Sequence, residues 1–246
     1  MPDPGAKIPS WSDHVEVEER RLQEYMCQKN HTITLRGACE ALQHTLEPMP
    51  TTTAEDGLVH FGDSLMLRSS HTEGLLLADV QDMVEVSDAG TEPRGPSVST
   101  AKLLKACPRN VFTISRVSDS DGFGETVYLH YGQPIRFSTS TPCLSEKPFY
   151  LFGSEAAVAS ADADEGEKLA CLHRRASSKT HWIVCPLAQT EHSEKVVALE
   201  TPFRLVSVAT GCCLRSDFTI HMNNYGNELR VFSSMNSDLP PDVEKA

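Results

Sequence analysis

Two pairs of cysteine and histidine residues carry side chains that can bind zinc. Cys171 and His173 are separated by one residue, and His181 and Cys185 by three. A zinc site needs these thiolate and imidazole groups to converge on one tetrahedral centre. One intervening residue is not a common ligand spacing, and the strand that we expect here places Trp182 in the core. We therefore expect no metal site and no cofactor.

Adjacent cysteines at 212 and 213 raise the question of redox chemistry. In the internal repeat identified below, they take the places of Leu75 and Leu76. Neighbouring residues of a strand point to opposite faces, so we expect neither a vicinal disulfide nor a shared metal. At least one should be a small buried hydrophobe. None of the eight cysteines forms a Cys-x-x-Cys pair, and the first residues contain no apolar leader segment, so we expect free thiols in a reducing compartment.

Sequence motifs of the common enzyme classes are missing. The chain has no Gly-x-Ser-x-Gly, P-loop, His-Glu-x-x-His or dinucleotide-binding fingerprint. Its ten histidines and many carboxylates show no spacing that selects an acid–base pair. We therefore predict no catalytic residues and no enzyme activity. The segment Arg174-Arg175-Ala176-Ser177 resembles a basophilic-kinase site, which makes Ser177 a candidate for phosphorylation; the alternative is an unmodified solvated turn.

Charge and hydropathy limit the partners. The 246 residues carry a formal net charge of −12. Nucleic acids and anionic membranes both need a basic protein surface, so neither is an expected partner. No run of apolar residues is long enough to span a bilayer.

Local composition divides the chain into four parts. Residues 1–14 contain three prolines and should form an extended arm. Residues 15–50 predict a helical segment, with a thin apolar stripe of Leu22, Tyr25 and Met26. From residue 57 to 235, β-branched and aromatic residues alternate with polar ones between turn residues, which predicts an all-β domain. Residues 236–246 should form a C-terminal tail.

An internal repeat specifies the architecture of the all-β domain. Three segments align with steps of 70 and 68 residues, and each places a turn residue before an apolar–x–apolar triplet. A further aromatic element recurs at the same interval. The repeated positions that we expect in the core are Leu65, Leu67, Phe112, Ile135, Phe137, Trp182, Phe203 and Leu205.

Three all-β repeats of about four strands each predict a β-trefoil, in which the lobes share one core. We place the lobes at about 57–118, 125–186 and 195–235. The third lobe lacks the aromatic element that precedes the end of the other two, because the chain ends shortly after Arg230-Val-Phe-Ser-Ser234. We therefore expect the trefoil to lack its last strand. An open edge exposes backbone groups, so we predict that a neighbouring protein covers it around Val231 and Phe232.

Three stretches resemble two known families. Residues 202–234 (PFRLVSVATGCCLRSDFTIHMNNYGNELRVFSS) are similar to a MIR-type trefoil lobe, with an apolar–Arg–Leu strand, a Thr-Gly turn and a Gly-x-Glu-x-x-Val-like strand. Residues 5–19 (GAKIPSWSDHVEVEE) and 55–63 (EDGLVHFGD) resemble the family of cilia- and flagella-associated protein 161. The match is patchy but runs across nearly all the chain.

The resemblance implies a structural microtubule inner protein. Such a protein lines the lumen of the doublet microtubules of the ciliary and flagellar axoneme, in the A-tubule, and contacts tubulin and other inner proteins. It implies no enzyme activity. In this interpretation, Trp11 anchors the N-terminal arm to a partner, and Leu22, Tyr25 and Met26 of the helical segment join it in partner binding.

An alternative is a carbohydrate-type ligand-binding module of MIR or lectin type. A lectin needs clustered polar groups and an aromatic platform. The third lobe contains such a set, consisting of Asp217, His221, Asn223, Asn224 and Tyr225. The same residues are also typical of a solvated loop, so both interpretations stay open.

Overall fold

The computed structural model describes residues 40, 42–86, 94–118, 122–124, 126–139, 147–158, 166–187, 195–235 and 243–245. Residues 42–44 are helical and precede the β-domain. The predicted arm over 1–14 and the residues Trp11, Leu22, Tyr25 and Met26 lie outside the described residues. Two compact units divide the chain between His44 and Thr45, and everything below concerns the second unit.

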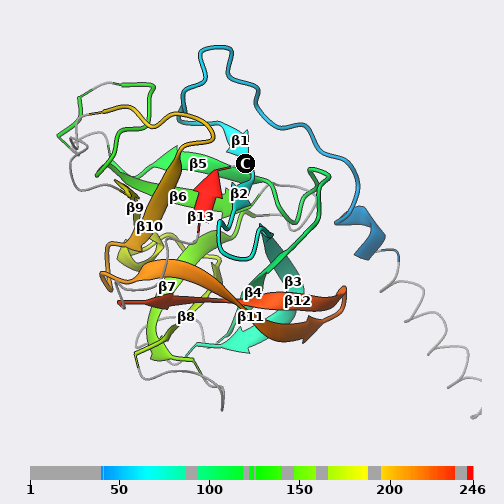
Figure 1. Cartoon of the computed structure of the whole chain (residues 1–246). Coiled ribbons are helices and arrows are strands. Elements are labelled where there is room, and N and C mark those ends of the chain that lie inside the picture. Colours follow the sequence, from blue (N-terminus) through cyan, green and yellow to red (C-terminus); the bar gives the residue numbers. More distant parts are fainter. Residues whose placement is uncertain are drawn as a thin grey trace, which may run out of the picture. The chain divides into compact units, whose positions relative to one another are not determined.

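Strands from three successive lobes build the β-domain (Figure 1). The first lobe contains β1 (Ser64–Leu65), β2 (Leu67–Arg68), β3 (Leu75–Glu85), β4 (Arg94–Ala101) and β5 (Phe112–Arg116). The second contains β6 (Pro134–Thr139), β7 (Tyr150–Ala157), β8 (Lys168–His173), the 3₁₀ turn η1 (Ser178–Thr180) and β9 (Trp182–Pro186). The third contains β10 (Pro202–Ser207), β11 (Cys213–Asn223), β12 (Gly226–Ser234) and β13 (Val243–Lys245).

The first and last strands of each lobe close a barrel by antiparallel pairing. β1 pairs with β5, β5 with β6, β6 with β9, and β9 with β10. β13 then pairs with both β10 and β2, which returns the sheet to the first lobe. The register is equivalent in each lobe, because Leu65 pairs with Phe112 and Ile135 with Trp182. This closed sheet with three equivalent lobes is the predicted β-trefoil.

The middle strands form three hairpins that cap the barrel. β3 pairs with β4, β7 with β8, and β11 with β12. The inner strands of the hairpins also pair with one another, because β4 contacts β8, β8 contacts β12, and β12 contacts β4. The cap is therefore a triangle with the same threefold arrangement as the barrel.

A ring of three backbone hydrogen bonds links the segments that lead into the barrel. Val59 N–H donates to the Val197 carbonyl over 3.0 Å, Val197 to Leu129 over 2.7 Å, and Leu129 to Val59 over 2.9 Å. All three side chains are buried. Equivalent segments about 70 residues apart in sequence therefore meet at one place, as expected if the three repeats share one core.

The eight repeated positions all lie in one buried cluster at the centre of the barrel. Trp182 is fully buried, and its indole N–H donates to the Leu151 carbonyl over 2.9 Å. A buried tryptophan needs such a partner for its N–H group. The cluster draws its side chains from all three lobes, so no lobe could bury its apolar face alone.

The expectation of a missing last strand is wrong. Val243–Lys245 forms β13, between β10 and β2 (Figure 1). Val243 pairs with Phe203, as Phe112 pairs with Leu65 and Trp182 with Ile135. The barrel edge that was expected to be open is closed by the chain itself, within the range predicted to be a C-terminal tail.

Residue Glu200 adopts a backbone conformation that the other lobes assign to glycine. Gly62 and Gly132 lie two positions before the first barrel strand of their lobes, as Glu200 does in the third lobe, and they have φ of 92° and 81°. Glu200 has φ of 61°. A side chain in this left-handed region is strained by about 1 kcal/mol or more, so the third lobe adopts the same turn with a less suitable residue.

The structure shifts the alignment of the adjacent cysteines by one residue. Ser69 N–H donates to the Gly74 carbonyl, and Ser207 N–H to the Cys212 carbonyl, so Cys212 is equivalent to Gly74. Cys213 is equivalent to Leu75, not Leu76. Cys212 is fully buried and Cys213 is half-buried. Both are free thiols, as are the other three described cysteines.

Candidate binding surface

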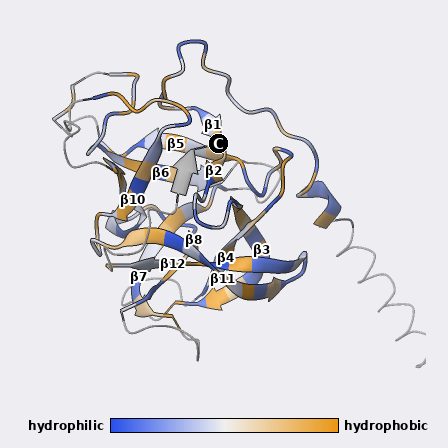
Figure 2. Cartoon of the chain, viewed as in Figure 1, coloured by the Kyte–Doolittle hydropathy of each residue, from blue (hydrophilic) through white to orange (hydrophobic). Residues whose placement is uncertain are grey.

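The hairpin of β11 and β12 carries an unusual set of exposed apolar side chains. Leu214 and Ser216, near the start of β11, are buried. Further along the strand, Phe218, Ile220 and Met222 are 64%, 60% and 78% exposed. We call these three residues the β11 ladder. They alternate with polar residues, as the colouring by hydropathy shows for the cap hairpins (Figure 2).

A buried ion pair fixes this hairpin to the first lobe. Arg109 donates to the two carboxylate oxygens of Glu228 over 2.8 and 3.0 Å, and its Nε donates to the Ala78 carbonyl over 3.0 Å. Ser99 and Asn223 each donate to Glu228 over 2.5 Å. Burial alone would raise the pKa of Glu228, but these hydrogen bonds outweigh it and hold the pKa below the ordinary value.

Tyr225, in the turn between β11 and β12, belongs to the same network. The Arg109 guanidinium lies over its ring, 3.4 Å from the centroid. The phenol oxygen is 2.6 Å from the hydroxyl of Thr45, which ties the segment before the barrel to the hairpin. Burial raises the pKa of Tyr225, so the phenol stays protonated at neutral pH. The Tyr225 N–H also donates to Asn223 Oδ1 over 2.9 Å, so the turn is held through both its backbone and its side chain.

A second ionic cluster joins β12 to the start of β8. Arg230 donates to Glu167 over 2.8 and 3.3 Å, and also to Asp217 on β11. Burial alone would raise the pKa of Asp217, but the hydrogen bonds from Arg230 and from the backbone of Thr219 lower it overall. This cluster fixes the base of the hairpin, just before the β11 ladder begins.

His221 connects the middle of β11 with the first lobe. Its Nε2 lies 2.9 Å from Oδ2 of Asp82 on β3. Both side chains remain partly exposed. Further towards the base of the ladder, the ring of His71 lies 5.1 Å from that of Phe218. The first and third lobes therefore share the border of this surface.

Asp79 is the equivalent of Asp217 in the first lobe but lies deeper. Its Oδ1 accepts hydrogen bonds from the backbone N–H groups of Gln81 and Asp82, at 3.0 and 3.2 Å, which shapes the irregularity in β3. Its Oδ2 is buried and has no hydrogen-bond partner in the described part of the chain. Burial raises the pKa of Asp79, because the charged carboxylate is poorly solvated there.

The residues proposed for a carbohydrate site are engaged within the protein. Asp217 binds Arg230, His221 binds Asp82, and Asn223 donates to Glu228. Tyr225 is covered by Arg109 and bound to Thr45. Asn224 is exposed at the turn. These groups stabilise the hairpin, so four of the five polar groups are not directed at a ligand.

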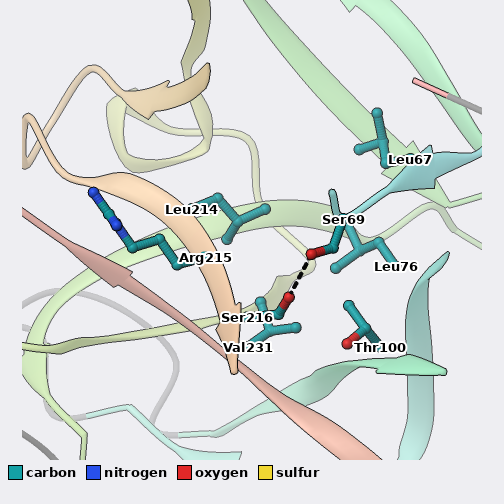
Figure 3. A pocket seen from close by; sticks show the side chains of 8 residues that line it. All are labelled: Leu67, Ser69, Leu76, Thr100, Leu214, Arg215, Ser216 and Val231. Carbon is teal, nitrogen blue, oxygen red and sulfur yellow. Dashed lines mark hydrogen bonds between the residues drawn. The ribbon is translucent and has the colours of Figure 1, made fainter. Parts of the chain in front are cut away.

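Two pockets among the described residues are small and mainly apolar. One lies where the first and third lobes meet, and Figure 3 shows Ser69 and Ser216 facing each other across it, with the Ser216 hydroxyl donating over 2.8 Å. Arg215 points away from the other lining side chains (Figure 3). The other pocket lies in the barrel interior beside Leu67 and Phe137. Each has room for about one water molecule.

The predicted partner residues at the end of the third lobe require a correction. Val231 and Phe232 are buried, at 6% and 3% exposure, and Val231 is part of the main core cluster. They point into the protein because β12 is an inner strand of the cap, paired with β4, β8 and β11. They cannot form a partner surface, and the exposed apolar residues of this hairpin lie on β11 instead.

The candidate zinc ligands on β8 and before β9 have other partners. Cys171 and His173 are buried on β8, with His173 stacked on Phe152 and bonded to the backbone of Arg175. His181 lies 2.8 Å from Arg136, and burial and this cation lower its pKa. Among the described residues, no group of three metal-binding side chains is assembled.

The candidate phosphorylation site Ser177 lies before η1. Its backbone N–H donates to Thr180 Oγ1 over 3.1 Å, and its own Oγ is shielded from solvent. A kinase would have to open this turn to reach the hydroxyl. Because the Ser177 hydroxyl is shielded, the structure favours the unmodified turn at this residue. The neighbouring Ser178 is exposed.

The sequence contains a signal for the β11 ladder that the internal repeat does not reveal. Phe218-Thr-Ile-His-Met222 alternates apolar and polar residues, which predicts a strand with one apolar face. Such a face is normally buried. Only the structure shows that β11 extends beyond the core, so that the apolar face meets solvent.

Comparison with known proteins bears on the resemblance seen in the sequence. A protein named cilia- and flagella-associated protein 161 from Danio rerio is 28% identical over 153 residues, and the protein of that name from Bos taurus is 26% identical over 163 residues. The chain is similar to cilia- and flagella-associated protein 161. No family model matches it.

The similarity to cilia- and flagella-associated protein 161 covers 56% and 60% of the chain, and 49% and 48% of the two relatives. The chain thus spans about half the length of the curated relatives that it matches. The names of these relatives support a role connected with cilia or flagella.

Solved structures support the fold. A Caenorhabditis elegans protein of unknown function has a TM-score of 0.59 at 12% identity, covering 79% of this chain and 98% of that one. The SDF2-like protein from Arabidopsis thaliana also has a TM-score of 0.59, at 13% identity, and the match covers 77% of this chain and 94% of that protein. Identities this low carry information about the fold alone. No helix in the described ranges is long and apolar enough to cross a membrane.

Proposed function

We propose that the chain is a structural, non-enzymatic protein of the ciliary or flagellar axoneme, which binds the luminal face of the doublet microtubules. Its partners in this proposal are tubulin, within the A-tubule, and other microtubule inner proteins. The similarity to cilia- and flagella-associated protein 161 supports the location. The surface chemistry of the third lobe supports a protein partner.

The observation that carries the proposal is the contrast between polar and apolar groups on the β11–β12 hairpin. The polar side chains that could recognise a small ligand are bound to one another, whereas Phe218, Ile220 and Met222 face solvent. Contiguous exposed apolar side chains with a polar rim mark protein–protein contacts. A rigid hairpin with such a surface suits a protein that is wedged permanently among others.

Fractionation of ciliated cells tests the proposal. The tagged chain would be expressed in cells that lack their own copy, and the axonemes would be stripped of membrane and washed with high salt. We expect the chain to stay with the doublets in a fixed ratio to tubulin, and to give averaged density inside the A-tubule. Release of the chain with the membrane and matrix fraction would refute the proposal. The predicted contribution of Trp11 can be measured in the same way with Trp11→Ala.

A further inference from the structure

We propose that the outer edge of β11, from Phe218 to Asn223, binds an extended segment of a partner protein as an added β-strand. The segment has apolar residues at alternate positions and lysine or arginine between them. This inference rests on the proposed function, because it identifies the surface and the kind of segment through which the chain is held among its partners.

The backbone of β11 offers a free edge at this place. β11 pairs with β10 only near its start, where Cys213 is opposite Val206. From Ile220 to Asn223, β11 pairs with β12 on one side. In the ranges that the structure describes, no strand pairs with its other side there. Alternate residues of an edge strand direct N–H and C=O groups outward, and these groups accept a further strand.

The β11 ladder supplies side-chain contacts in the matching pattern. Ile220 and Met222 lie on one face of the strand where β11 pairs regularly with β12, and Phe218 lies in the irregular stretch between Ser216 and Ile220. Each of the three side chains is more than half exposed. A strand that adds to β11 continues the sheet, so its alternate side chains lie beside the ladder on the same face. Apolar residues at every second position of the partner would cover the ladder.

The shape of the surface favours an extended segment over the flat face of a globular protein. The ladder is one strand wide and three side chains long. A standard interface buries about 800 Å² on each partner, which a strip of this size cannot supply. In strand addition, main-chain hydrogen bonds provide most of the affinity, and alternate side chains provide specificity.

Charge on the opposite face of β11 specifies basic residues in the partner. His221 shares that face with Asn223, and Asp82 of the first lobe lies 2.9 Å from the His221 ring. The whole chain carries a net charge of −12. Lysine or arginine on this face of the added strand would meet Asp82 directly.

The hairpin of the first lobe serves as an internal comparison, and its described residues lack these features. Where β3 and β4 leave the described part of this hairpin, Glu85 and Arg94 form an exposed ion pair, with their atoms 3.4 Å apart. Charges at the end of a hairpin oppose the addition of further strands. Met83 is its only residue among the large exposed apolar side chains of the described chain. In its described residues, the first-lobe hairpin therefore opposes strand addition at the place where the third lobe favours it.

The first test compares two triple variants in the full-length chain. Phe218→Thr, Ile220→Thr and Met222→Thr together remove the apolar ladder but keep β-branched residues suited to a strand. The control changes Leu104, Val127 and Met235 to threonine, which removes three apolar side chains outside the ladder that are each more than half exposed. We expect the axonemal abundance of the ladder variant to fall about tenfold or more, and that of the control variant to equal the wild-type value. Equal abundance of the two variants would overturn the inference.

The second test identifies the occupant. A photo-crosslinking residue at position 220 is activated in the intact axoneme, and the crosslinked peptide is sequenced. The same residue at position 235 is the control. We expect position 220 to capture one segment with alternating apolar and basic residues, and position 235 not to capture it. Crosslinks from position 220 that fall only on helical segments, or on a second copy of this chain, would contradict the inference.

The two tests separate this inference from the proposed function. If the wild-type chain stays with the doublets and the ladder variant does so equally, the inference fails and the proposed function stands. If the wild-type chain leaves the doublets but position 220 still captures an alternating basic segment in ciliary extract, the proposed function fails and the inference stands.

Discussion

Replacement of Arg109 by methionine tests how the β11–β12 hairpin is held in place. The change removes two hydrogen bonds to Glu228, one to the Ala78 carbonyl, and the contact with the Tyr225 ring. Methionine fills a similar volume, so the loss is mainly electrostatic. Glu228 would remain almost fully buried, with only Ser99 and Asn223 as donors.

The expected loss of unfolding free energy is large. Breaking a buried ion pair by removing one partner costs about 3–5 kcal/mol, because the remaining charge is uncompensated. The total free energy of unfolding of a domain of this kind is about 5–15 kcal/mol. At a typical slope of about 2 kcal/mol per molar urea, the midpoint should fall by about 2 M. Urea unfolding of the full chain, followed by the fluorescence of buried Trp182, measures this shift.

A matched control separates the buried pair from surface charge. Arg94→Met breaks the pair with Glu85, in which both side chains are mostly exposed. Exposed pairs contribute about 0–1 kcal/mol, so this variant should unfold nearly as the wild type does. The double variant Arg109→Met, Glu228→Gln should lose less unfolding free energy than the sum of the losses in the two single variants. The reason is that Glu228→Gln removes the buried charge that Arg109→Met leaves without a partner. An Arg109→Met variant within about 1 kcal/mol of wild type would show that the buried pair does not hold the hairpin.

The barrel and the cap yield three further predictions. Glu200→Gly should stabilise the chain by about 0.5–1 kcal/mol in urea unfolding, because glycine relieves the left-handed strain; an equal gain from Glu200→Ala would contradict this. Removal of residues 236–246 should cost about 2–4 kcal/mol and speed hydrogen exchange in β10 and β2, which lose their shared neighbour β13; unchanged exchange there would exclude the pairing. Because burial raises the pKa of Asp79, the wild type loses stability as pH rises through that pKa. The unfolding free energy of the Asp79→Asn variant, relative to that of the wild type, should therefore increase as the pH rises above the ordinary aspartate pKa of about 4. A difference that stays constant with pH would refute the assignment.

The fold can be predicted from the sequence because the trefoil repeats its core. Leu65, Ile135 and Phe203 recur at nearly constant intervals, and each must fill the same place in a shared interior. A repeat of this kind fixes the number of lobes and the location of the barrel strands. It does not fix which residues are equivalent after a turn. The repeat therefore aligns the adjacent cysteines with first-lobe residues that lie one position beyond their structural equivalents.

The last strand cannot be found from the repeat, for a physical reason. The position equivalent to Phe112 and Trp182 is Val243, which lies 61 residues after Trp182 instead of about 70. Strand pairing uses the backbone, which any residue except proline provides in full. A search for an aromatic side chain therefore misses a strand that is defined by its hydrogen bonds. Without that strand, the expected partner surface falls on Val231, which is buried because β12 is an inner strand of the cap.

The ion pairs and the β11 ladder are parts of one arrangement. An exposed apolar strand at the end of a mobile hairpin would have to lose conformational freedom on binding, and that loss weakens association. Here Arg109 holds Glu228 and Tyr225, and Arg230 holds Asp217, so the hairpin is ordered before any partner arrives. Buried polar groups of this kind contribute less to stability than apolar packing would. Their position on either side of the ladder, at its turn and at its base, is explained if they keep the free edge of β11 ordered and available for a further strand.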